Sequence, residues 1–248
     1  MRLILSVAAT LVFALAAVPL SAEPREDEAR GAAQARTNSA LLDEAFALIQ
    51  RGQPAAAIER LDRIIAYYEK AYAGEKRRIY CARSNAETLL YLLSAASEKK
   101  DAVALDSTWS DAVFGKAFAL IDLRRKDEAR AMLERAIELS PNNSQYAAEL
   151  AEMKKNEHDW KGALELFEKA ADDAALADDA DQPRLKARAW RGIGYAHIEL
   201  GDLDKAEEMF LKCLKLDPND RGAQSELQYL KDLRKQQPKA NAGPPSQG

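Results

Sequence analysis

The chain has 248 residues, of which 47% are hydrophobic and 31% are charged, and its formal net charge is −4 at pH 7. This length is sufficient for one elongated domain. The mildly acidic balance excludes an electrostatic nucleic-acid-binding protein, because such a protein carries a concentrated basic footprint.

The first 22 residues have the pattern of an export signal. Positive charge at the first two residues precedes an apolar stretch over 3–18, and 20–22 offers a cleavage site. We expect cleavage after Ala22 and a periplasmic or secreted mature protein that is one unit more negative than the full chain. The alternative is a retained membrane anchor, because residues 3–20 contain no charge and have about the length of a spanning helix.

The next residues, 23–37, are charged and rich in alanine, which indicates a linker or a fraying helix. A recurring pattern of small and bulky residues then begins near Asn38. In 38–71, this pattern comprises Ala45, Gly52, Ala57, Leu61 and Ile64. Glycine shortens the turn between two helices, and alanine permits their close approach, so this segment predicts a helical hairpin.

The segment 72–109 lacks the glycine and the bulky aromatic residue of the pattern. Ser84 and Glu87 have the spacing of a capping box, which marks the start of a helix. The leucines that follow are Leu89, Leu90, Leu92 and Leu93. We expect a degenerate helical unit here.

Two further units follow, at 110–143 and 144–186. Ala129 and Ala163 occupy the same place in the two units and are 34 residues apart. The pattern comprises Ala129, Leu133, Ala136 and Pro141 in the first, and Ala163, Phe167 and Ala170 in the second. The next corresponding alanine, Ala206, comes 43 residues after Ala163, so the second unit contains an insertion, which we place in the acidic segment 175–183.

The unit 187–220 has the strongest pattern. Its key positions are Trp190, Ile193, Gly194 and His197, then Ala206 and Phe210, and finally Pro218. In this interpretation Gly194 faces Ala206, and Phe210 fills the adjacent gap. The segment 221–236 has leucines at helical spacing among charged residues, which predicts a capping helix. Residues 237–248 are rich in proline and glycine, and we expect a disordered tail.

These residues resemble the tetratricopeptide repeat, whose 34-residue pattern is W-x2-L-G-x2-Y, A-x3-F and a closing proline. His197 departs from it where tyrosine is usual, and Lys116 departs where leucine is usual. The resemblance covers about 38–220 and implies an all-α fold, a right-handed superhelix of helical hairpins with a C-terminal capping helix. It also implies that the first helix of each unit lines a concave groove, which accepts an extended peptide or a partner helix.

The positions that face the groove in this family are occupied here by aromatic and basic residues. They are Phe46, Phe114, Phe118, Arg188, Arg191 and Tyr195. Aromatic rings supply apolar contact, and guanidinium groups grip carboxylates. Arg188 and Arg191 resemble part of the carboxylate clamp of chaperone-binding members, but Leu42 and Phe46 replace the basic and amide residues expected in the first unit. The alternative for Phe114 and Phe118 is packing between adjacent repeats.

The sequence offers no catalytic arrangement, cofactor fingerprint or metal motif. Neither His158 nor His197 has a relay partner at motif spacing. The acidic residues Asp172, Asp173, Asp178, Asp179 and Asp181 lack the glycine and closing glutamate of a calcium loop, so we expect a solvated loop.

The two cysteines, Cys81 and Cys213, are separated by two repeats, so we expect buried free thiols and no disulfide. The resulting hypothesis is an exported, non-catalytic scaffold or assembly factor that binds a protein or peptide, without nucleic acid, cofactor, metal or membrane contact after signal cleavage. The alternative is a membrane-anchored structural component of an envelope complex. The sequence leaves the oligomeric state open.

Overall fold

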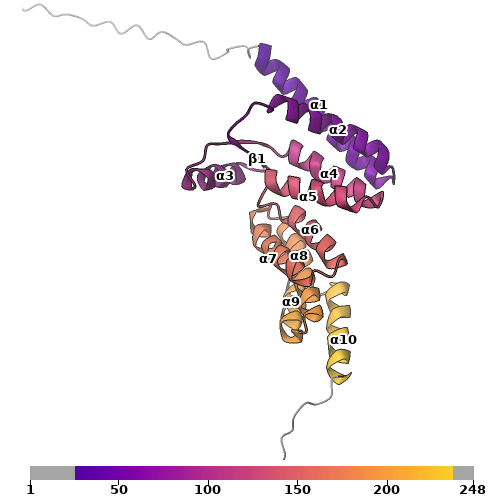
Figure 1. The fold of residues 1–248 in the computed structure, drawn as a ribbon. Helices are drawn as coiled ribbons and strands as arrows, with labels where there is room; N and C mark the ends of the chain where they lie inside the picture. Colours follow the sequence, from indigo (N-terminus) through magenta and orange to yellow (C-terminus); the bar gives the residue numbers. More distant parts are fainter. Residues whose placement is uncertain (1–25, 237–248) are drawn as a thin grey trace, which may run out of the picture. The chain divides into compact units, whose positions relative to one another are not determined.

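The computed structural model describes residues 26–236 (Figure 1). The predicted signal at 1–22 and the predicted tail at 237–248 lie outside the described residues. The chain divides at Thr37 into two compact units, and everything that follows concerns the larger unit, which starts at Asn38. The described part of 23–37 is helical.

The described residues are largely helical, which confirms the expected helical-repeat fold. The α-helices are α1 (Glu26–Gln50), α2 (Pro54–Ala71), α3 (Asn85–Ser97), α4 (Thr108–Asp122), α5 (Lys126–Leu139), α6 (Ser144–Asn156), α7 (Trp160–Asp173), α8 (Gln182–Glu199), α9 (Leu203–Leu216) and α10 (Arg221–Gln236). A 3-10 helix (Ala174–Leu176) follows α7, and two strands, β1 (Arg78–Ala82) and β2 (Ala102–Asp106), flank α3. None of the described helices is long and apolar enough to span a bilayer.

The helices form hairpins in which α4 packs against α5, α6 against α7 and α8 against α9. The turns share one geometry. A residue with positive φ follows each first helix, at Gly52, Arg124, His158 and Gly201. The next amide donates a hydrogen bond five residues back, as from Arg125 to Leu120 O at 2.9 Å. This closure satisfies the last carbonyls of the helix and reverses the chain within three residues.

Glycines in α8 allow aromatic rings to approach the helix backbone. A Cβ atom on Gly194 would lie 2.6 Å from the ring of Phe210 on α9, and one on Gly192 would lie 2.5 Å from the ring of Phe167 on α7. The atoms nearest to such a Cβ on Gly194 belong to the Phe210 ring, so this ring fills the space beside the glycine, as the sequence interpretation expected of an adjacent gap. Gly192 likewise lets Phe167 connect one hairpin to the next.

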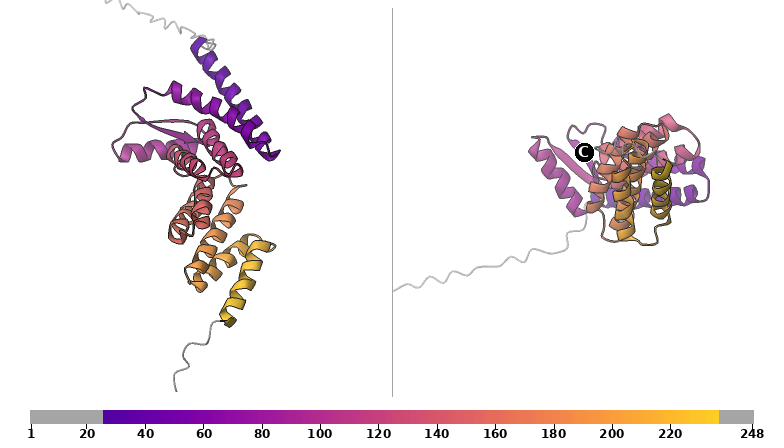
Figure 2. Two further views of the ribbon diagram at one scale, coloured as in Figure 1. Left: turned by 45° about the vertical axis from the view of Figure 1, so that its right-hand side comes forward. Right: turned by 90° about the horizontal axis from the view of Figure 1, so that it is seen from below.

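The segment 72–109 differs from the expected degenerate helical unit, because it contains a β-α-β unit. Strands β1 and β2 are parallel, with Arg78 opposite Ala102 and Ala82 opposite Asp106, and α3 connects them (Figure 2). The predicted capping box is present in part, since the Glu87 amide donates to Ser84 Oγ at 3.2 Å. The strands have five residues each, too short for their alternation to outweigh the leucine pattern of α3.

The two cysteines are free and buried, which confirms the prediction. Burial raises the pKa of Cys81 to about 12 and that of Cys213 to about 11. Both thiols are therefore protonated near neutral pH. The segment 221–236 is helical throughout, as α10, and buries Ala223 and Leu230 beside Phe210 of α9.

The acidic segment after α7 is not entirely the solvated loop that the sequence suggested. Asp173 is buried at the end of α7, where it accepts a hydrogen bond from Asn142 Nδ2 at 2.8 Å. It also pairs with Lys169 at 2.6 Å. Asp173 therefore connects α7 to the turn that precedes α6, whereas Asp178 and Asp179 are exposed.

Candidate functional site: a groove along the first helices

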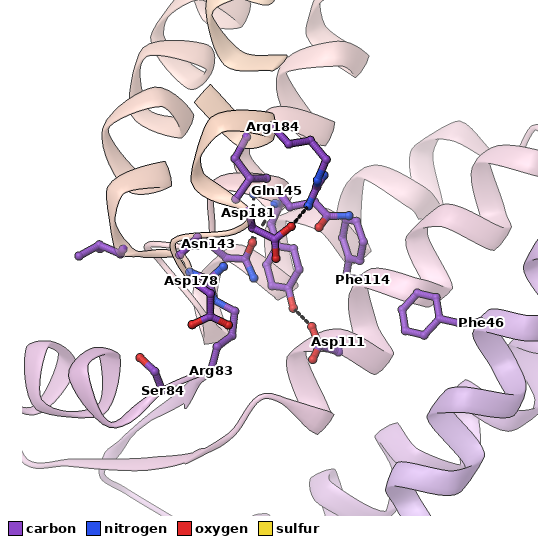
Figure 3. A pocket seen from close by; sticks show the side chains of 14 residues that line it. Phe46, Arg83, Ser84, Asp111, Phe114, Asn143, Gln145, Asp178, Asp181 and Arg184 are labelled. Atoms are coloured by element: carbon purple, nitrogen blue, oxygen red, sulfur yellow. Dashed lines mark hydrogen bonds and ion pairs between the residues drawn. The ribbon is translucent and has the colours of Figure 1, made fainter. Parts of the chain in front are cut away.

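Two hollows lie along the first helices of the hairpins. The N-terminal pocket, about 410 Å³, is lined by α1, the β1–α3 connection, α4, the start of α6 and the segment that leads into α8 (Figure 3). The C-terminal pocket, about 370 Å³, is lined by α6, α8, α10 and Phe210 of α9. We call the two pockets together the groove.

Tyr146 of α6 forms the buried floor of the N-terminal pocket. Its ring stacks on Phe114 of α4, with 4.7 Å between the ring centroids. Its hydroxyl donates a hydrogen bond to Asp111 Oδ1 at 2.5 Å (Figure 3). Burial raises the pKa of Asp111, and this hydrogen bond acts in the opposite direction. The residue before α6, Asn143, caps the helix by accepting from the Gln145 amide at 3.0 Å.

The basic residues of the N-terminal pocket are held by carboxylates. Arg83 enters from the β1–α3 connection and pairs with Glu87, which is buried. Its backbone amide donates to Glu87 Oε2 at 2.8 Å. Arg184 of α8 pairs with Asp181 at 2.9 Å, and both side chains lie at the mouth of the pocket (Figure 3).

The C-terminal pocket has the same pairing of charges. Arg188 pairs with Glu149 of α6 at 2.8 Å, and Arg191 pairs with Asp220 at 2.5 Å. The ammonium of Lys155 lies over the ring of Tyr195, 5.0 Å from its centroid. The groove thus presents arginines and carboxylates in pairs beside aromatic rings.

Two carboxylates at or beside the C-terminal pocket and two at the exposed surface have opposite pKa shifts. Burial raises the pKa of Glu149 and of Glu226, although Arg188 acts in the opposite direction on Glu149. At the exposed surface, hydrogen bonds from Arg125 and Lys212 lower the pKa of Glu128 and of Glu208. As the pH falls, Glu149 and Glu226 therefore lose negative charge before these surface groups do.

The six predicted site residues divide between the two pockets. Phe46 and Phe114 line the N-terminal pocket, whereas Arg188, Arg191 and Tyr195 line the C-terminal pocket. Phe118 is not among the lining residues of either pocket. It is 36% exposed one turn beyond Phe114, and their ring centroids are 5.9 Å apart. Phe114 is 4% exposed and stacked on Tyr146, so it packs between repeats as the alternative proposed.

The sequence interpretation missed several pocket residues that its own rule reaches. Asp111 and Gln145 stand at the second position of their units, as Arg188 does, and Glu152 stands at the ninth, as Tyr195 does. Asp111 and Gln145 line the N-terminal pocket and Glu152 the C-terminal one. None of these three residues is aromatic or basic, and the predicted groove residues were all of those two types. Arg83 had no such signal, because it follows a strand that the sequence did not predict.

One histidine lies in a turn between two helices, and the other lies within a helix. His158 lies in the α6–α7 turn at φ 62°, and its ring is 4.9 Å from that of Trp160. His197 is buried in α8, and burial lowers its pKa. Among residues 26–236, no group of three or more histidine, cysteine or acidic side chains is arranged to hold a metal ion.

Comparisons with known proteins agree with this architecture. The tetratricopeptide repeat family profile matches residues 110–143 and again 187–220. The structure is similar to that of pilF from Pseudomonas aeruginosa, with 13% identity, coverage of 82% of this chain and 72% of that chain, and a TM-score of 0.58. It is also similar to MamA from Desulfovibrio magneticus RS-1, with 20% identity, coverage of 80% and 85%, and a TM-score of 0.51.

At these identities the two structures show a shared fold alone. The two repeat matches identify the units with the clearest pattern, and each of these units forms one of the helical hairpins, α4–α5 and α8–α9. The chain is therefore a tetratricopeptide-repeat protein.

Proposed function

We propose that this protein is an exported scaffold or assembly factor that binds a segment of another protein in the groove, without making or breaking a bond. Tetratricopeptide repeats are generally non-catalytic protein-interaction scaffolds. The observation that supports the proposal is the arrangement of the two pockets, in which aromatic rings and paired charges line successive first helices.

The lining favours a peptide as the occupant. Tyr195 offers a partly exposed ring for an apolar side chain, and Arg184 offers an exposed guanidinium for a carboxylate or a backbone carbonyl. The paired charges add selectivity. A partner group that binds one of these arginines displaces the carboxylate paired with it, and must then take the place of that carboxylate as the partner of the arginine. An unpaired charge buried in the groove would be unfavourable, so the groove discriminates between partners by charge pattern.

The test is capture of the partner by variants of each pocket. Arg188 and Arg191 are poor targets, because their partners Glu149 and Asp220 are largely buried, and a glutamate at either position would bring two carboxylates together away from solvent. Arg184→Glu changes an exposed group and Tyr195→Ala a partly exposed one. We expect the double variant to weaken capture about 10-fold or more in quantitative crosslinking from the native compartment, because it removes one contact from each pocket.

Lys212→Glu is the matched control, since Lys212 pairs with Glu208 within α9, away from both pockets. It should capture the partner as the wild type does, and all variants should retain the helical circular dichroism spectrum. Unchanged capture by the folded double variant, or an equal loss in the control, would show that the groove does not bind the partner.

Export is the second part of the proposal, and it is supported by the sequence pattern of residues 1–22. We expect the protein purified from its native compartment to begin at Glu23, which N-terminal sequencing reads directly. A chain that begins at Met1 would support the alternative, a membrane-anchored structural component of an envelope complex.

A further inference from the structure

The outward face of α3 is uncharged and largely apolar, with Asn85, Ser94 and Ser97 as its exposed polar residues. Its four leucines are exposed: Leu89 at 59%, Leu90 at 37%, Leu92 at 37% and Leu93 at 60%. Ala86 and Ala96 share this face and are exposed as well. The helix contains no charged residue except Glu87, which is buried on the opposite side. This distribution inverts the usual one, in which a surface helix turns its polar side outward.

The polar and aromatic side of α3 is fixed against the protein. Glu87 is held by Arg83, and the ring of Tyr91 stacks on Tyr80 of β1 with 5.0 Å between centroids. The Tyr91 hydroxyl also accepts a hydrogen bond from the Asn142 amide at 3.4 Å. These contacts set the rotation of the helix. The leucines therefore stay exposed among residues 26–236, and only something outside this described part can cover them.

Basic residues gather where α3 ends and the strands begin. The parallel register brings Arg78 opposite Ala102, so the segment before β1 lies beside the segment that leads from α3 into β2. Together these segments carry five basic residues, Lys76, Arg77, Arg78, Lys99 and Lys100, and three acidic residues, Glu75, Glu98 and Asp101. They are locally basic in a chain with a net charge of −4.

We call these two segments, residues 75–78 and 98–101, the basic end, and it is accessible. Lys76 and Lys99 are exposed, and a hollow of about 570 Å³ is lined by Lys76, Arg77, Arg78, Lys100 and Arg135, together with the acidic residues Asp101 and Glu138. Three of the lining basic groups are paired, Arg77 with Glu75, Lys100 with Glu98 and Arg135 with Glu138. With Lys99 beside the hollow, six basic and four acidic residues lie in and around it, so its surroundings keep a positive excess. An apolar helix face thus ends at a cationic hollow.

We propose that α3 and this basic end dock on an anionic lipid surface. The leucines would enter the interface between headgroups and acyl chains, and Lys76 and Lys99 would contact lipid phosphates. The apolar face of α3 complements the acyl chains of such a surface, and the cations at its end complement the anionic headgroups. This proposal goes beyond groove binding and departs from the sequence-based expectation of no membrane contact.

The shape of the patch favours a membrane over a second copy of the chain. A single helix of 13 residues supplies a patch on the order of a few hundred Å², whereas a stable protein–protein interface buries about 800 Å² per partner. In addition, α3 lies on the outer side of the strand pair in both views of Figure 2. A projecting helix can enter a lipid surface without any matching groove.

The test reads the environment of α3 directly. Ser97 is exposed and follows Leu93 by one helical turn, so Ser97→Cys carries an environment-sensitive fluorophore on the leucine face of the full chain. The native cysteines are buried and should not react. We expect a blue shift with vesicles of equal parts phosphatidylcholine and phosphatidylglycerol, a weaker response with phosphatidylcholine alone, and a reduced response at high salt.

The same label on Ser225→Cys in α10 is the control for contributions from the N-terminal apolar segment or from general adsorption. Adding Leu89→Ser and Leu93→Ser to the Ser97→Cys chain should weaken vesicle binding about 10-fold or more, whereas Leu211→Ser, at a leucine of α9 that is 45% exposed, should not. Lys76→Glu with Lys99→Glu should remove the preference for anionic vesicles.

Three results would overturn the proposal. No shift at Ser97→Cys with either vesicle would mean that a protein or nothing covers α3. Equal shifts at Ser97→Cys and Ser225→Cys would mean unspecific adsorption. A shift without lipid that grows with protein concentration would mean that a second copy covers the helix. Because the leucines line neither groove pocket, partner capture by the groove should be unchanged in the leucine variants, which separates this test from that of the proposed function.

Discussion

Replacing Phe167 with alanine is expected to lower the free energy of unfolding by about 3–5 kcal/mol. The side chain is fully buried, and its ring covers Gly192 of the following hairpin. Its loss therefore leaves a cavity between α7 and α8, where two hairpins meet. In a repeat protein stability depends on contacts between neighbouring units, so the change weakens both the hairpin and its junction. Urea denaturation followed by circular dichroism measures the effect.

Phe118→Ala is the matched control, because Phe118 is partly exposed and should contribute about 1 kcal/mol or less. A second comparison tests the pairing with glycine. Gly192→Ala should destabilise the wild type by about 1–3 kcal/mol through overpacking, and less in the Phe167→Ala background, where the ring is absent. If Phe167→Ala costs no more than the control, the proposed junction between hairpins is incorrect.

Replacing Arg83 with methionine is expected to cost about 3 kcal/mol of folding stability. Glu87 is the reason, since its side chain is 1% exposed and Arg83 is its ion-pair partner. The variant leaves a buried carboxylate with the Arg83 amide and without the guanidinium. We place the cost at the low end of the range for broken buried pairs, because Arg83 itself is 26% exposed.

A double variant tests this explanation. Arg83→Met together with Glu87→Met removes both charges, so it should recover about 2 kcal/mol relative to Arg83→Met alone. Chemical denaturation of the wild type, both single variants and the double variant gives the complete cycle. Additive losses would contradict the account, because they would mean that the two side chains stabilise the β-α-β unit independently.

The sequence predicted the repeat where side chains determine it. The residue types of Ala206, Phe210 and Pro218 return at equivalent positions of other units. They do so because two helices pack closely only over small residues and because proline ends a helix. Turns were harder to predict. Gly52 and Gly201 are recognisable, but Arg124 and His158 adopt the same left-handed geometry without glycine. There the closure of the helix imposes the conformation, so the residue type gives no indication of it.

The strand pair and part of the site depend on contacts distant in sequence. β1 pairs with β2 across 24 positions, from Arg78 to Ala102, and this pairing brings Arg83 to the groove. The family's groove positions led to residues of both pockets. They did not show that Phe114 is buried beneath Tyr146 or that Arg188 already pairs with Glu149. Such pairings follow from tertiary packing, which a periodic pattern does not encode.

Site-specific photo-crosslinking tests the central claim most directly. A photoreactive amino acid at Gln145 or Tyr195 places the probe in the N-terminal or the C-terminal pocket, and the same residue at Lys212 on α9 provides the comparison. The account predicts one shared protein partner crosslinked from both pocket positions in the native compartment, and none from Lys212. Crosslinks from Lys212 alone, with neither pocket position labelled, would show that the partner binds elsewhere.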